Sequence, residues 1–203
     1  MLECETHRAL NRLVGEHAVN SAVEGNYSHF HMARLSAHTP SDPRRSWKRQ
    51  YLRFALRGRG KALEIGFNAG HSAAIMLAAE PGLIVFSIDI GVHPYTLPCA
   101  KYMEAAFPER FTYVEGDSKV VLDAIDLSYF DFVHIDGGHE LSTVENDLSF
   151  FCQRANSGTF LMVDDAYSPA IANAINARIK RNLIVPAQCG LPSSGENWLF
   201  YKV

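Results

Sequence analysis

The sequence predicts an α/β fold, a Rossmann-like, doubly wound and mostly parallel sheet of about seven strands with an antiparallel last strand. Short apolar runs of strand length recur along the chain, and segments suited to helices of ten or more residues separate them. Polar and acidic residues directly follow several of these runs. At 203 residues the chain is long enough for one such domain and too short for two.

The apolar runs place the strands in order along the chain. Strands are expected at 61–65, 83–88 and 111–115, from Phe130 and from Thr159, and at 183–188 and 197–202. The helix-forming run Ala73–Ala79 follows the first strand. Further helices are expected near 95–107, 118–125, 140–154 and 169–180. The intervening segment 189–196 is rich in glycine, proline and serine, which is typical of a long hairpin between the last two strands.

Residues 1–58 differ in composition from the core at 59–203, and we expect them to form a helical cap over the ligand face. Asp42 and Pro43 suit the N-cap and first turn of a helix that runs to about Arg57. Arginines recur there at every fourth position, and no acid occurs from Arg44 to Lys61. These cations form either a solvated outer face or a patch for a phosphorylated or carboxylated substrate, or for RNA.

The junction after the first strand predicts a nucleotide pocket. Glu64 lies near the end of the strand, and Gly66 and Gly70 stand at the turn into the helix. Glycine permits a tight turn and close approach of a ligand, and the start of a helix offers unpaired N–H groups to an anion. The glycine spacing differs from the G-x-G-x-x-G that binds a dinucleotide, which argues against NAD. The alternative is an ordinary strand-to-helix connection without a ligand.

The next two strands also end in polar side chains. Asp89 ends the second strand, where an acid can accept hydrogen bonds from a ribose diol. Asp117 and Ser118 follow the third strand, within reach of an adenine edge. Ligands of open α/β sheets bind outside the carboxyl ends of the strands, so these residues are expected to meet at one crevice.

Three aspartates are the predicted metal site. Asp136 follows the fourth strand, and Asp164 and Asp165 follow the fifth. If the strands are parallel neighbours, three like charges meet at one edge and need a counter-ion. Oxygen ligands favour Mg²⁺ or Ca²⁺, with Mn²⁺ a further candidate. The alternative for Asp164 and Asp165 is hydrogen bonding to loop amides without an ion.

His139 is the predicted base. It stands three residues after Asp136 at the start of a helix, where the helix dipole and a nearby cation favour the neutral imidazole. A neutral imidazole can accept a proton. The alternative is a capping role or support of a metal ligand.

Composition excludes several classes of protein. The net charge of −3 gives no global attraction to nucleic acid, and Glu80, Pro81 and Gly82 interrupt the longest apolar stretch, so we expect no membrane span. The four cysteines are dispersed without a C-x-x-C pair, which argues against a zinc site and a disulfide framework. The first residues lack a secretion signal pattern, so we expect a cytoplasmic protein.

The motifs in their order resemble the class I S-adenosylmethionine-dependent methyltransferases, and among them the metal-dependent O-methyltransferases of the catechol and caffeoyl-CoA type. The resemblance covers residues 60–203 and rests on E64-I-G-F-N-A-G-H-S, S87-I-D-I, G116-D-S, H134-I-D-G-G-H and V163-D-D. It is strongest for bacterial proteins with an I-D-G-G-H fourth strand.

The resemblance implies roles for individual residues. The methionine part of S-adenosylmethionine is expected beside Glu64, Gly66, Asn68, Gly70 and Ser72, the ribose at Asp89, and the adenine at Ser118 and Asp117. The metal is expected at Asp136, Asp164 and Asp165, although the family commonly has asparagine as its third ligand. His139 stands where the catechol enzyme has a lysine base.

The implied reaction is metal-assisted methylation of a small hydroxylated acceptor, with a vicinal diol suited to chelation. The alternatives are a metal-independent methyltransferase that acts on nitrogen, a sugar or RNA, and a SAM-binding module without catalysis. The acceptor and the oligomeric state, for which a homodimer is one candidate, are left open.

Overall fold

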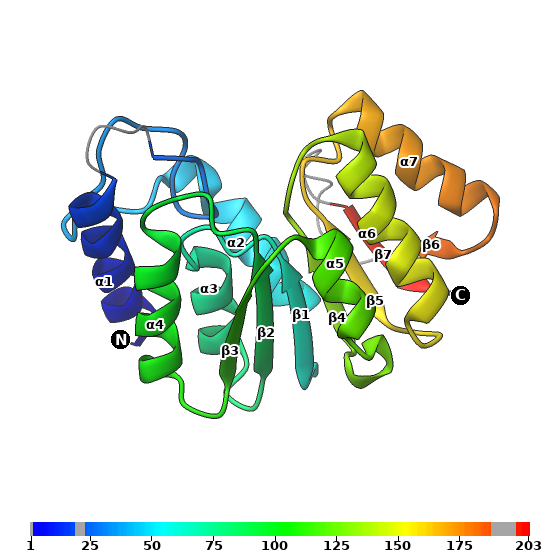
Figure 1. Cartoon of the computed structure of the whole chain (residues 1–203), viewed down its shortest axis with the longest axis horizontal. Helices are drawn as coiled ribbons and strands as arrows, with labels where there is room; N and C mark the ends of the chain where they lie inside the picture. Colours follow the sequence, from blue (N-terminus) through cyan, green and yellow to red (C-terminus); the bar gives the residue numbers. More distant parts are fainter. Residues whose placement is uncertain (1, 19–22, 188–197) are drawn as a thin grey trace.

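The computed structural model describes residues 2–18, 23–187 and 198–203, and these form a layered α/β structure (Figure 1). The described strands make one sheet in the order β3-β2-β1-β4-β5-β7-β6. Their bounds are β1 Lys61–Ile65, β2 Ile84–Asp89, β3 Phe111–Glu115, β4 Phe132–Ile135, β5 Phe160–Val163, β6 Ile184–Pro186 and β7 Trp198–Lys202. The order confirms the predicted fold class.

The sheet has a switch point between β1 and β4. From β1 the chain moves outward through β2 to β3, and it then returns to β4 on the other side of β1. All pairs from β3 to β5 are parallel, whereas β7 runs antiparallel to both β5 and β6. Ile65 is level with Ile88 and Ile135, and Ile135 is level with Val163, so four strands end side by side.

Both faces of the sheet are buried, which explains the continuous apolar runs in its central strands. Ala62 and Met162 face one hydrophobic core, with residues of helices α1 to α4, while Leu63 and Val163 face a second core with residues of α5 to α7. The helices are α1 Leu2–His17, α2 Ser46–Ala55, α3 His71–Ala79, α4 Thr96–Ala106, α5 Ser118–Val121, α6 Leu141–Arg154 and α7 Pro169–Lys180, with 3₁₀ turns at Pro43–Arg45, Leu122–Ala124 and Leu127–Tyr129.

The N-terminal segment contains a helix that the sequence analysis did not predict. Helix α1 packs on α3 and α4, and Leu10 and Val14 are fully buried there. The helix predicted from Asp42 begins as a 3₁₀ turn, whose N-cap is Asp42 with its side chain bonded to the Arg44 amide, and continues as α2. The predicted hairpin strands pair as expected, but their connection at 189–196 lies outside the described residues. No helix in the described part of the chain has the length and apolar content needed to cross a membrane.

Candidate functional site

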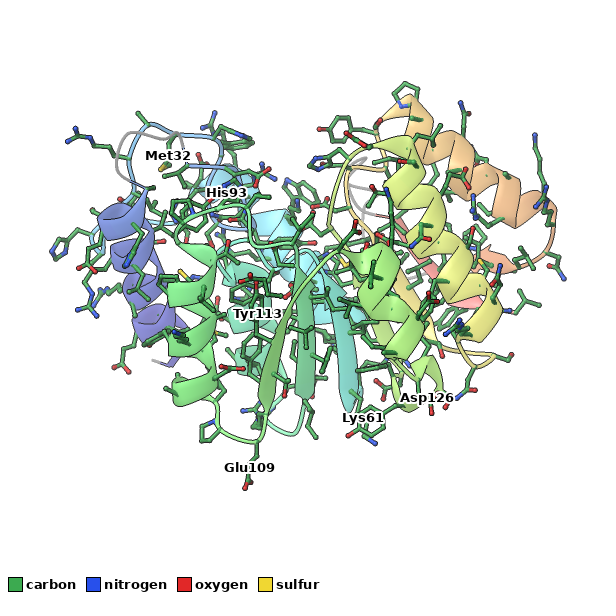
Figure 2. The ribbon with its side chains drawn as sticks, viewed as in Figure 1. Met32, Lys61, His93, Glu109, Tyr113 and Asp126 are labelled. Carbon is green, nitrogen blue, oxygen red and sulfur yellow. The ribbon has the colours of Figure 1, made fainter. Side chains whose placement is uncertain are left out.

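A cavity of about 790 Å³ opens at the carboxyl ends of the parallel strands. One wall comes from the loops after β1 to β5, and the other from residues 24–27, Phe30 and His31 together with Arg45 and Lys48. His93, which contributes to the cavity, lies at the opposite end of the molecule from Lys61, Glu109 and Asp126 (Figure 2). The cavity therefore lies where an open α/β sheet binds ligands.

The glycines after β1 are required by the fold itself. Gly66 has a φ of +100°, and a Cβ atom on it would lie 2.0 Å from the carbonyl oxygen of Asp136. Gly70 has a φ of +79° at the N-cap of α3, and a Cβ atom there would overlap the ring of Phe67. The loops after β1 and β4 thus touch backbone to backbone at the switch point. Gly66 lines the cavity and Gly70 does not.

Glu64 does not line the cavity. It is fully buried, and its two oxygens accept hydrogen bonds from Ser72 Oγ at 2.5 Å and Ser87 Oγ at 2.6 Å. His134 Nδ1 lies 3.6 Å from the same carboxylate, and His134 Nε2 is 2.8 Å from the hydroxyl of Tyr27. The place of Glu64 beside the methionine moiety stays a prediction, and the structure shows Glu64 in a buried polar chain that reaches Tyr27 of the N-terminal segment.

Asn68 and Asp89 both line the cavity and are linked to each other. The Asp89 carboxylate accepts from the amide of Asn68 at 2.7 Å and from the amide of Gly91 at 2.8 Å. Asn68 Nδ2 donates to Glu24 at 3.1 Å, and His93 Nε2 donates to the same Glu24 oxygen at 2.8 Å. This hydrogen bond raises the pKa of His93 and lowers that of Glu24. Glu24 and His93 belong to the site and were missed because no strand end or motif marks them.

Asp117 and Ser118 reach the cavity from the end of β3, and Ser72 reaches it from α3. Asp117 caps α5 by accepting from the Lys119 amide at 2.9 Å, and its side chain remains exposed. Ser118 is buried, and its hydroxyl donates to Asp147 at 2.8 Å. Both residues therefore have structural partners in addition to their place in the cavity wall.

The acids after β4 and β5 converge as predicted, but a side chain of the protein supplies the counter-ion. Lys48 of α2 forms an ion pair with Asp164, and the two side chains are only 5% and 3% exposed. Burial and the charge of Asp164 raise the pKa of Asp136 well above its usual value. Burial would also raise the pKa of Asp164, but Lys48 and a hydrogen bond with Asp136 outweigh burial and lower that pKa.

The third acid, Asp165, belongs to a second pair. Its backbone is left-handed, with a φ of +52°, and its side chain pairs with Nε2 of His139. This hydrogen bond raises the pKa of His139 despite the opposing effect of burial. The sequence-based expectation of a neutral imidazole included the helix dipole and a metal but not Asp165, which favours the protonated form.

The predicted metal ligands do not fit a resident divalent ion in this arrangement. Within the described residues, no three His, Cys, Asp or Glu side chains are grouped as a metal would require. Asp164 contacts an ammonium group and Asp165 contacts an imidazole. Metal binding by Asp136, Asp164 and Asp165 therefore stays a prediction from the sequence.

The arginines of α2 and of the 3₁₀ turn before it mostly bind within the N-terminal segment. Arg53 pairs with Glu3 of α1, with N–O distances of 2.5 and 2.7 Å. Arg49 donates to the carbonyl oxygens of Tyr27 and Asp42, and Arg45 lies 4.1 Å from the ring centroid of Phe30. These contacts hold the segment over the cavity, and of this group only Arg45 lines it.

Comparison with known proteins identifies the family and the fold of this chain. A family model described as a methyltransferase domain matches residues 63–166, just over half of the chain. No sequence among curated proteins matches the chain.

Solved structures of similar fold include SAH-bound methyltransferase PaMTH1 of Podospora anserina, with a TM-score of 0.63, 12% identity and coverage of 80% of this chain and 82% of that one. The O-methyltransferase TomG of Streptomyces achromogenes, solved with SAM, has a TM-score of 0.62 and 15% identity over 98% of this chain and 89% of its own. The TDP-rhamnose 3′-O-methyltransferase CalS11 has a TM-score of 0.60 and 15% identity over 76% of each chain.

At these identities the likeness establishes the fold, and the family model adds the class. The chain belongs to the methyltransferase domain family and has the fold of the SAM-dependent O-methyltransferases.

Proposed function

We propose that the protein transfers the methyl group of S-adenosylmethionine to a hydroxyl group of a small acceptor molecule. The observation that supports this most directly is the composition of the cavity. One wall consists of strand ends within the methyltransferase domain, and the other consists of residues 24–27, Phe30 and His31 with Arg45 and Lys48. A cavity of about 790 Å³ is in the size range of small-molecule sites.

The donor is expected in the half of the cavity formed by the loops after β1, β2 and β3. Asp89 can accept from a ribose diol while it holds the amides of Asn68 and Gly91, because a carboxylate has about four acceptor positions. The backbone at Gly66 offers close approach, and Ser72 and Ser118 add hydroxyl groups. When bound, S-adenosylmethionine supplies a methyl group on a sulfonium sulfur, and its transfer leaves S-adenosylhomocysteine.

The acceptor is expected in the other half, between the N-terminal segment and the loops after β4 and β5. Phe30 and His31 line this part together with Asp136 and His139. With Nε2 of His139 donating to Asp165, the other ring nitrogen is directed away from that bond and, in the neutral ring, can accept the hydroxyl proton. Asp165 then orients the base. The protein otherwise contributes by holding the acceptor oxygen in line with the methyl group.

Binding of the donor product is the first test. Calorimetric titration should show that S-adenosylhomocysteine binds and that NADH does not. Asp89→Asn should weaken the binding of S-adenosylhomocysteine by about 10-fold or more, because a hydrogen bond to a charged group contributes about 1.5–3 kcal/mol. The matched control is Asp126→Asn, an exposed cap at the opposite end of the molecule, which should leave the affinity unchanged (Figure 2). Equal affinities in the wild type and both variants would contradict the placement of the donor.

Turnover is the second test. Wild-type protein, S-adenosylmethionine and a panel of small hydroxylated compounds should yield S-adenosylhomocysteine and an O-methylated product, identified by mass spectrometry. Product formation only on nitrogen acceptors would contradict the proposed acceptor class and leave the donor assignment intact.

A further inference from the structure

Lys48 occupies an unusual position for a lysine. Its ammonium group contacts the Asp164 carboxylate, and its Nζ atom lies 4.4 Å from the ring centroid of Tyr27. Its side chain is 5% exposed. A lysine is rarely buried unless it is paired, because an isolated ammonium ion loses its hydration. The structure compensates that loss with a carboxylate on one side and an aromatic ring on the other.

The same ammonium group also acts on Asp136. Lys48, Asp136 and Asp164 all line the same cavity, and the charge of Asp136 adds to that of Asp164 in favouring the protonated, cationic form of Lys48. Asp136 and Asp164 follow neighbouring strands whose ends are level, at Ile135 and Val163. The positive charge of Lys48 therefore interacts with the two acids that follow β4 and β5.

A divalent ion bound by Asp136 and Asp164 would need the position that the Lys48 ammonium group occupies. An ion bridging Asp136 and Asp164 would have to displace the Lys48 ammonium from Asp164, and it would meet the repulsion of that charge nearby. The third acid is turned to His139. The described site thus contains a partner from the protein itself for Asp164, the ammonium group of Lys48, and one for Asp165, the imidazole of His139.

We propose that Lys48 is the resident counter-ion of the Asp136–Asp164 pair and that it replaces a divalent metal in this protein. The proposal rests on the proposed function, because it describes how methyl transfer proceeds at the same site. Lys48 acts as a positioning residue, since its charge fixes the two acids at the acceptor side of the cavity. The acceptor then needs only one hydroxyl group, because no chelation by two adjacent oxygens is involved.

Metal binding is the readout that separates this role from a purely structural one. Mn²⁺ binding to the apo protein can be measured by electron paramagnetic resonance, without any acceptor. We expect wild-type protein to show no specific Mn²⁺ binding. Lys48→Met, which keeps the length of the side chain and removes its charge, should bind Mn²⁺ at least about 10-fold more tightly, because two carboxylates lose their internal counter-ion.

Three further variants assign the effect to this site. Lys48→Met combined with Asp136→Asn should lose the gained Mn²⁺ binding, and Lys48→Arg, which keeps the charge, should not acquire it. Lys180→Met, at an exposed position on α7, is the matched control and should behave as the wild type. Circular dichroism establishes that each variant is folded.

Specific Mn²⁺ binding by the wild type that Asp136→Asn abolishes would overturn the proposal, as would loss of wild-type methyl transfer after exhaustive chelation. Both measurements use the wild type as their reference, so the proposal remains testable even if Lys48→Met fails to fold. Failure of the proposed function is distinguishable, because it appears as absent binding of S-adenosylhomocysteine whatever the Mn²⁺ result.

Discussion

Gly66→Ala is expected to destabilise the protein at the contact between the loops after β1 and β4. A Cβ atom at this position would lie 2.0 Å from the carbonyl oxygen of Asp136 and 2.7 Å from the amide nitrogen of Gly137. Both contacts are to backbone, so no side-chain rotation relieves them. Alanine must also adopt a φ of +100° or shift the chain.

A second glycine separates the cost of the left-handed backbone from the cost of the Cβ overlap. Gly158 has a φ of +84°, but a Cβ atom there would meet nothing within 4 Å. A left-handed backbone costs alanine about 1–2 kcal/mol, and the stiffer unfolded chain returns about 0.4–1 kcal/mol, so Gly158→Ala should cost about 1 kcal/mol. Gly66→Ala carries this cost and an overlap of about 1–3 kcal/mol, which gives about 2–4 kcal/mol in total.

The measurement is urea unfolding of the wild type and both variants, followed by circular dichroism and compared at an unchanged m-value. The midpoint of thermal unfolding should fall by about 2–4 °C for each kcal/mol in a chain of this length. If Gly66→Ala costs no more than Gly158→Ala, the backbone contact at the switch point does not constrain the site, and the structural account of Gly66 is refuted.

The remaining predictions concern the N-terminal segment, where His29 and His7 both pack against the ring of His71. Burial lowers the pKa of His29 to about 4, so between about pH 6.5 and 4 the unfolded chain binds a proton there that the folded chain does not. Thermal melts should therefore lose stability as the pH falls through this window, and His29 should account for up to about 3 kcal/mol of the loss. Burial also lowers the pKa values of His7 and His71, which add to the loss. His29→Gln should flatten that slope, and an unchanged slope would contradict the assignment. Arg53→Ala removes a partly exposed pair with Glu3, so chemical unfolding should show a loss below about 1 kcal/mol, and a larger loss would mean that the pair does more than a surface ion pair.

The sheet was predictable because its strands are buried on both faces. Phe160–Val163 is apolar at every position, and its four side chains are all buried, two against each helical layer. Such runs stand out in the sequence without any knowledge of their neighbours. The end of each strand then locates a site residue, which is why Asp89, Asp136 and Asp164 were found and why they line one cavity.

The N-terminal segment was less predictable, because its contacts are made across the fold. Tyr27 reaches His134, which lies 107 positions later, and no local pattern encodes that distance. Glu24 likewise meets Asn68 and His93 only after the segment has folded over the strand ends. Helix α1 did carry a signal, since Leu10, Leu13 and Val14 recur at helical spacing.

The spacing of buried residues in α2 gave a signal in the sequence for the burial of Lys48. The buried residues of this helix are Lys48, Tyr51, Leu52 and Ala55, at spacings of three and four, so Lys48 lies within the apolar face of the helix. A lysine there must meet a carboxylate, because burial of its charge alone is too costly. The acids at the strand ends were predicted to need a cation, and the expected cation was an external metal ion. The lysine on the apolar face of α2 and the acids at the strand ends compensate each other's charges. The fold brings Lys48 and Asp164 together although they lie 116 positions apart in the sequence.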